Sequence, residues 1–214
     1  DTSELDFTTH WALQGAGFTG DGTGYGFELH SCLAVVPDTA NPEIIGLANQ
    51  IGWARQHPLR RKQEKRTARY HRRTEADVWA ETLEAIGEAP PAALWVSVGD
   101  RGSDIFSYVR RARKLTWQVL LRVQKDRTIL PPDGRSGKLK QYARSLPAQA
   151  EKRIVIRGRS GKETRRVRLH IAWSAATLLP PTNDPREKKS DSISGWGIRC
   201  LKERFGMLCY RLLR

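Results

Sequence analysis

The 214-residue chain is long enough for one full domain, or for one domain and a smaller unit. Its hydrophobic content of 39% and its seven Trp can fill a core, which excludes a globally disordered protein. The formal net charge of +14 favours nucleic acid or another polyanion as partner, and the alternative is a solvated basic surface.

Neither a zinc ribbon nor a disulfide scaffold is expected, because Cys32, Cys200 and Cys209 show no C-x-x-C spacing and no even framework. No apolar stretch has the length of a membrane span, and no signal-peptide pattern opens the sequence. These observations predict a cytoplasmic protein with no membrane partner.

Three strands are expected in the first quarter of the chain: over residues 1–10 and 26–38 from alternating apolar residues, and over 42–55 from its apolar content. The glycines of GAGFTG (15–20) match a dinucleotide-binding fingerprint. That fingerprint needs a helix directly after it, and the continuation DGTGYG cannot form one. The glycines are therefore interpreted as a flexible loop between two strands.

Segment 55–73 contains nine Lys or Arg against one Glu. Two interpretations stay open: a solvated surface run, and an arm that contacts DNA phosphates. The arm would use Arg60, Arg61, Lys62, Lys65, Arg66, Arg69, Arg72 and Arg73.

An acid follows the next predicted strand. A helix over 74–91, with Thr74 and Asp77 as a capping box, precedes a short buried strand over 94–98 that Gly99 ends. Asp100 comes next, at the carboxyl end of that strand, where open α/β sheets place ligands and chemistry. Ser103 is expected to cap a second helix with Asp104 in its first turn, and a strand is expected over 117–123.

Beyond residue 131 the pattern becomes β-rich. A short helix is expected over 138–146, and the second GRSGK (158–162) is a turn between two alternating strands. Arg165, Arg166 and Arg168 surround the polar face of this hairpin and are further candidates for DNA contacts. The stretch after Thr177 has the composition of a linker.

Asp1 and Asp100 could converge if they lie on neighbouring strands of a mixed sheet, about 4.8 Å apart. Two convergent carboxylates in a basic protein suit Mg²⁺, which takes hard oxygen ligands. Paired metals activate water and stabilise the leaving oxygen of a phosphodiester.

Several motifs resemble those of DDE transposases of the insertion-sequence-four (IS-four) family. DTSELDFTTH is similar to the first-acid motif, GFELHSCLAVVPDT and IGLANQIGWAR to the second and third strands, and GDRGSDIFSYV to the second-acid motif. The resemblance implies Asp1 and Asp100 as catalytic metal ligands and Thr2, Arg101 and Asp104 as supporting residues.

The resemblance also implies an α/β fold with a ribonuclease-H-like mixed sheet. The expected boundaries are a partial catalytic core over 1–130, a β-rich insertion over 131–178, and a linker and aberrant tail over 179–214. The implied activity is DNA cleavage and strand transfer with Mg²⁺, which Mn²⁺ can replace. The implied partners are transposon-end and target DNA, and a homodimer is implied for a full-length parent.

The third family acid, a Glu in the frame Tyr-x-x-Arg-x-x-x-Glu, has no counterpart here. None of the acids after residue 131 fits that frame: Asp133, Glu151, Glu163, Asp184, Glu187, Asp191 and Glu203. We therefore expect an inactive copy, truncated at both ends, with a frame-shifted tail from about Gly195. An ordinary C-terminal helix is the alternative for the tail, and a non-catalytic DNA-binding remnant is the alternative for the function.

Overall fold

The computed structural model describes residues 1–37, 41–55, 73–156, 164–182, 192–202 and 210–212. It is a mixed α/β protein with several sheets and few helices, which confirms the predicted class at that level. The chain divides into two compact units, Asp1–Glu88 and Ala89–Arg214. The boundaries predicted at residues 130 and 178 both fall inside the second unit.

The first unit is built on an antiparallel sheet in which β3 (Gly24–Val36) pairs with three other strands. These are β1 (Thr2–Asp6), β2 (Gly17–Thr19) and β4 (Glu43–Trp53). The three predicted strands are confirmed, but the glycine segment 15–20 is not only a loop, because it contains β2. Gly26 must lack a side chain, since a Cβ there would collide with the carbonyl oxygen of Leu5 on β1.

The predicted helix is present as a short 3-10 turn, η1 (Glu75–Asp77), followed by α2 (Val78–Ile86). Thr74 and Asp77 form the predicted capping box. The helix buries Val78 and Leu83 and packs Trp79 edge-on against the ring of His30, with 4.5 Å between ring centroids. The face of the sheet that bears His30 is therefore the core-facing one.

Arg55 ties the end of β4 to the start of the helical segment. Its guanidinium is nearly buried and forms ion pairs with Glu28 at 2.8 Å and Glu75 at 2.5 Å. It also donates to the carbonyl oxygens of Phe18 and Gly20. Burial raises the pKa of Glu28, and the nearby Arg55 opposes that shift.

The far half of β3 and β4 forms a two-stranded ribbon, in which Leu33–Val36 pair with Glu43–Leu47. Two irregularities interrupt its register, after Cys32 and after Ala34. The ribbon leaves many of its large apolar side chains exposed, namely Leu33, Val35, Val36, Ile44, Ile45 and Leu47.

The second unit begins with a strand–helix–strand element. The strands β5 (Val96–Gly99) and β6 (Gln118–Leu121) pair in parallel, and η2 (Arg101–Ser103) and α3 (Phe106–Lys114) connect them. The predicted strands and helix are confirmed. The predicted burial of β5 is wrong for Val96 and Val98, which are 42% and 68% exposed.

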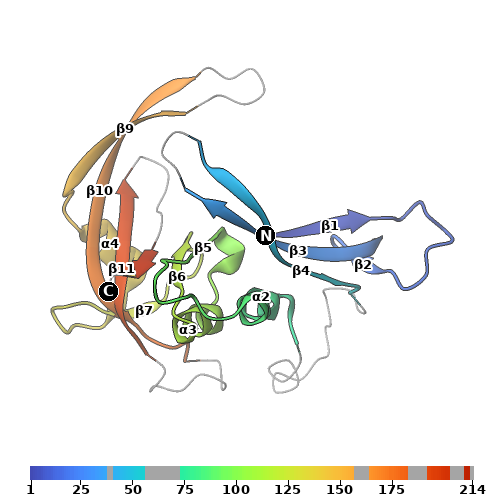
Figure 1. Cartoon of the computed structure of the whole chain (residues 1–214). Coiled ribbons are helices and arrows are strands. Elements are labelled where there is room, and N and C mark those ends of the chain that lie inside the picture. The colour runs from blue at the N-terminus through green and yellow to red at the C-terminus, as the bar shows by residue number, and fades with distance from the viewer. Residues whose placement is uncertain (38–40, 56–72, 157–163, 183–191, 203–209, 213–214) are drawn as a thin grey trace. The chain divides into compact units, whose positions relative to one another are not determined.

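The remaining strands form a second sheet, in which β10 (Arg165–Leu178) is the longest strand (Figure 1). It pairs with β7 (Thr128–Leu130), β9 (Ala150–Ile156) and β11 (Ile193–Lys202). Two short strands extend the sheet: β8 (Gly137–Lys138) pairs with β7, and β12 (Tyr210–Leu212) pairs with β11. The predicted hairpin and the short helix, α4 (Leu139–Ser145), are confirmed. The region 179–214 is not only linker and tail, because β11 and β12 lie within it.

Candidate active site and nucleic-acid interface

Asp1 stands at the start of β1, where the sheet holds its backbone on one side. Its amino group donates to the carbonyl oxygen of Ser31 at 2.7 Å, and the amide of Ser31 donates to the Asp1 carbonyl at 2.8 Å. The Asp1 side chain is exposed, and its Oδ1 accepts the amide of Thr2 at 2.8 Å. The second carboxylate oxygen has no hydrogen-bond partner among the described residues.

Asp100 follows β5 directly, at the carboxyl end of a parallel strand pair. Its Oδ1 accepts the amide of Gly102 at 2.7 Å and thereby caps η2, while its carbonyl oxygen accepts the buried Ser103 hydroxyl at 2.7 Å. The other carboxylate oxygen points to no hydrogen-bond donor in the described part of the chain. The turn thus fixes one oxygen and leaves the other available to a ligand.

Asp104 is buried, and its role differs from the predicted one. It lies before α3, which begins at Phe106 with Ile105 as its cap, so it is not a first-turn helix acid and Ser103 does not cap that helix. Instead its Oδ2 accepts the amides of Gln124 and Lys125 at 2.8 and 2.6 Å.

The other oxygen of Asp104 binds Arg127. Its Oδ1 accepts from Nε of that side chain at 3.0 Å and from Nη2 at 2.8 Å. Asp104 and Arg127 are only 7% and 12% exposed, so this is a nearly buried ion pair. Asp104 therefore fastens the loop after β6 to the turn that holds Asp100. Arg101, on the same turn, is exposed; its carbonyl oxygen accepts the Asp104 amide at 3.3 Å, and its side chain has no hydrogen bond among the described residues.

Asp1 belongs to the first unit and Asp100 to the second, so their predicted convergence stays a prediction. Among the described residues, no group of three or more His, Cys, Asp or Glu side chains is placed to hold a metal ion. The chemistry of the two acids still fits Mg²⁺, because each offers one free carboxylate oxygen, the ligand type that this ion prefers.

Of the predicted basic arm, only Arg73 lies within the described residues. It is engaged: Nε and Nη2 donate to Glu81 at 2.8 and 2.6 Å, and the guanidinium lies over the ring of Trp53. The hydrogen bond to Glu81 raises the pKa of Arg73. Its place in this network suits a structural role at the edge of α2 at least as well as a phosphate contact.

The hairpin β9–β10 sorts its basic residues onto two faces. Arg168 pairs with Arg153 and Arg166 with Val155, so these side chains share one face, and His170 lies on it two residues further along. We call Arg153, Arg166, Arg168 and His170 the basic face of the hairpin. Arg165 points to the opposite face, which also bears the buried Val167.

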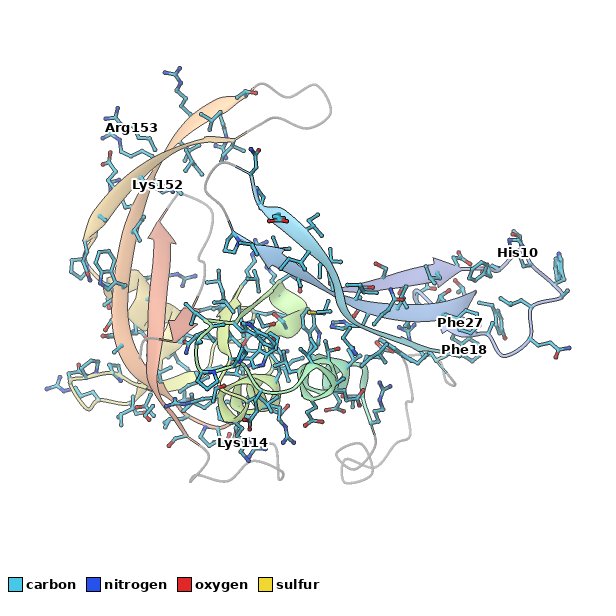
Figure 2. All side chains as sticks on the ribbon, viewed as in Figure 1. His10, Phe18, Phe27, Lys114, Lys152 and Arg153 are labelled. Carbon is cyan, nitrogen blue, oxygen red and sulfur yellow. The ribbon has the colours of Figure 1, made fainter. Side chains whose placement is uncertain are left out.

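Arg153, which is labelled on β9 in Figure 2, is a basic-face residue that the sequence prediction missed. It is 79% exposed, and the cross-strand register that places it beside Arg168 could have been inferred by aligning the two strands around the GRSGK turn. Glu151 neutralises part of the face, since it lies 3.2 Å from Arg168 and 3.9 Å from Arg153. Because three arginines stand against this one glutamate, the face remains positive overall.

Charge is divided unequally between the two units. The first has nine Lys and Arg against thirteen Asp and Glu, a net charge of −4, and the second has twenty-eight against ten, a net charge of +18. The whole basic excess of the protein therefore belongs to Ala89–Arg214.

His30 is a second residue that the sequence prediction missed. It is 2% exposed, and its Nδ1 lies 2.8 Å from the Thr2 hydroxyl. Burial lowers the pKa of His30 to about 4, so the imidazole is neutral at pH 7. No sequence signal marked it, because none of the five histidines shows metal-ligand spacing.

Comparison of the sequence with models of known protein families gave no match, and comparison with curated proteins gave none either. No helix among the described residues is long and apolar enough to cross a membrane.

Proposed function

We propose that this chain has the metal-binding core of a DDE-transposase-type protein and that its polyanionic partner is DNA. The observation on which this rests is the position of Asp100. It follows a parallel strand at the sheet edge where α/β proteins place their chemistry, and the buried Asp104–Arg127 pair fastens its turn. The motif containing Asp100 and Asp104 is the one that resembles the second-acid motif of the IS-four family.

The order of elements supports a ribonuclease-H-like fold for the proposed core. Three antiparallel strands, β1, β3 and β4, are followed by α2, and then by β5, α3 and β6 with the two strands parallel. This is the predicted order, with the short β2 added. The proposal keeps the predicted pairing of Asp1 and Asp100 as the two metal ligands.

Asp1 and Asp100 would hold Mg²⁺ or Mn²⁺ through their free carboxylate oxygens. The ion would supply a Lewis acid and a water of lowered pKa for attack on a phosphodiester. The chain's own contribution is positional: Gly102 and Thr2 donate backbone amides to the remaining oxygens, so each carboxylate is oriented before an ion arrives.

The basic face of the hairpin is the described surface that best suits DNA. Alternate residues on a strand are about 6.8 Å apart, which is about the rise of two nucleotides along one strand of the duplex. Arg166 and Arg168 are spaced in this way, and Arg153 stands across from Arg168. Arginine also forms paired hydrogen bonds with phosphate oxygens.

We further propose that this chain binds a divalent cation and DNA without cleaving the DNA. In-line displacement needs the metals held by more than two carboxylates, and no acid in this sequence has the frame of the third family Glu. The alternative, a basic DNA-binding protein without a metal site, differs in one respect: it predicts no Mn²⁺ binding that depends on Asp1 and Asp100.

Two measurements test the proposal. Mn²⁺ binding, followed by electron paramagnetic resonance, should weaken at least tenfold in Asp1→Asn and in Asp100→Asn. It should be unchanged in Asp133→Asn, a matched control in which an exposed Asp also caps a turn by accepting a backbone amide. Equal Mn²⁺ binding in all four proteins would refute the metal site and favour the alternative.

The second measurement is the nicking of supercoiled plasmid in Mg²⁺ and in Mn²⁺. We expect none above the level of Asp100→Asn. Cleavage that disappears in Asp100→Asn would mean that another acid completes the site, with Glu187 and Glu203 as the first to test, and the proposed inactivity would be wrong.

A further inference from the structure

We propose that His30 is a positioning residue that acts through Thr2 to hold the carboxylate of Asp1 in place. The inference rests on the proposed function for its significance, because Asp1 is the acid that function assigns to the metal. It concerns two contacts that the metal proposal does not use: the imidazole–hydroxyl bond and the packing of that imidazole against α2.

The ladder between β1 and β3 explains why these side chains meet. Asp1 and Ser31 exchange both backbone hydrogen bonds, so the next pair, Thr2 and His30, is a non-hydrogen-bonded pair. Side chains approach most closely at such pairs. The Thr2 hydroxyl and His30 Nδ1 accordingly lie 2.8 Å apart.

The same geometry turns the amide of Thr2 away from β3. Residues of a non-hydrogen-bonded pair direct their backbone groups to the outer edge of the strand. There the Thr2 amide donates to Asp1 Oδ1 at 2.8 Å. The hydroxyl and this amide belong to the same residue, so the bond to His30, together with the ladder pairs on either side, holds Thr2 in the backbone conformation from which its amide reaches the Asp1 carboxylate.

His30 can serve as an anchor because its ring is buried and packed. Its ring is 2% exposed and is packed edge-on against Trp79 of α2. Thr2 is exposed, so without the imidazole its hydroxyl would exchange bonds with water. A series of contacts therefore links α2 to Asp1: Trp79 packs against His30, His30 bonds to the Thr2 hydroxyl, and the Thr2 amide bonds to the Asp1 carboxylate.

The test is the removal of the hydroxyl in the full chain. Thr2→Val keeps the shape of the side chain, and Thr2→Ser restores the hydroxyl. Thr8→Val is the control, because Thr8 also binds an acid on β1, the exposed Asp6, at a distance from Asp1 in the sequence. Three quantities are measured: the ¹⁵N shifts of the His30 imidazole, the exchange rate of the residue-2 amide, and Mn²⁺ affinity.

We expect Thr2→Val to shift the imidazole resonances, to speed exchange of the residue-2 amide about tenfold and to weaken Mn²⁺ binding by a similar factor. Thr2→Ser should restore all three, and Thr8→Val should change none. Unchanged imidazole and amide signals in Thr2→Val, or no recovery in Thr2→Ser, would overturn the inference. If the unaltered protein binds no Mn²⁺, the proposed metal site fails, and the imidazole and amide signals still decide the role of His30.

Discussion

Replacing Asp104 by Asn should destabilise the second unit far more than its conservative shape suggests. The carboxylate accepts four hydrogen bonds in a nearly buried site, two from backbone amides and two from Arg127. An asparagine has one accepting oxygen. Its NH₂ group would face either the two amides or the guanidinium, and the Arg127 charge would lose its counter-charge.

Removing one partner of a buried ion pair costs about 3–5 kcal/mol. We expect the lower end, about 3 kcal/mol, because Arg127 is 12% exposed and keeps its bond to the Asp104 carbonyl. With a urea m-value of about 2 kcal/mol/M, the unfolding midpoint should fall by about 1.5 M.

Unfolding of this unit can be followed through the amide resonances of β6, where Val119 is fully buried. Asp133→Asn is the matched control, since Asp133 is exposed and accepts one backbone amide, and it should lose no more than about 0.5 kcal/mol. A loss in Asp104→Asn no larger than in this control would show that Asp104 does not hold the loop after β6, and the argument for a fastened Asp100 turn would fail.

Three further outcomes are expected. The folded pKa of His30, about 4, lies below its unfolded value of 6.5, so the unfolded state takes up a proton first as the pH falls. The free energy of unfolding should therefore not depend on this group above pH 6.5 and should fall by about 2 kcal/mol by pH 5. Urea titrations should show this loss in the unaltered protein and not in His30→Asn. DNA affinity should fall steeply with salt concentration. When the basic face is neutralised, the slope of log affinity against log salt should decrease by about 0.9 for each lost phosphate contact; the variants are Arg153→Gln, Arg166→Gln and Arg168→Gln. Arg165→Gln, on the opposite face, should change the slope less. A third variant tests whether the basic segment 55–73 binds phosphate or is a solvated surface run, and it neutralises Arg60, Arg61, Lys62, Lys65 and Arg66. An unchanged slope in this variant would assign DNA binding to the hairpin.

Local patterns in the sequence predicted most elements correctly. Alternation marked β3 and β10, apolar content marked β4, and the capping box marked the start of the helical segment at Thr74, because these signals depend on neighbouring residues only. The strand β11 was missed because the preceding segment has a linker composition, and its strand character comes from pairing with β10.

The candidate site was predicted less completely, because its contacts join residues that are distant in the sequence. Asp100 was identified from its place after an apolar strand. The role of Asp104 depends on amides twenty and twenty-one residues further along, which no local pattern reveals. His30 was missed because its burial follows from the packing of α2 on the sheet, and Arg153 because its partner is set by cross-strand register.

The ribbon of β3 and β4 has a consequence for handling the protein. Beyond Ser31, β3 pairs only with β4 among the described residues, so its other edge presents unpaired backbone groups between exposed apolar side chains. Such an edge is a template for intermolecular strand addition and aggregation. The register irregularities after Cys32 and Ala34 bend the ribbon and disturb that template, and straightening it by deleting one irregular residue should make the protein aggregate at lower concentration.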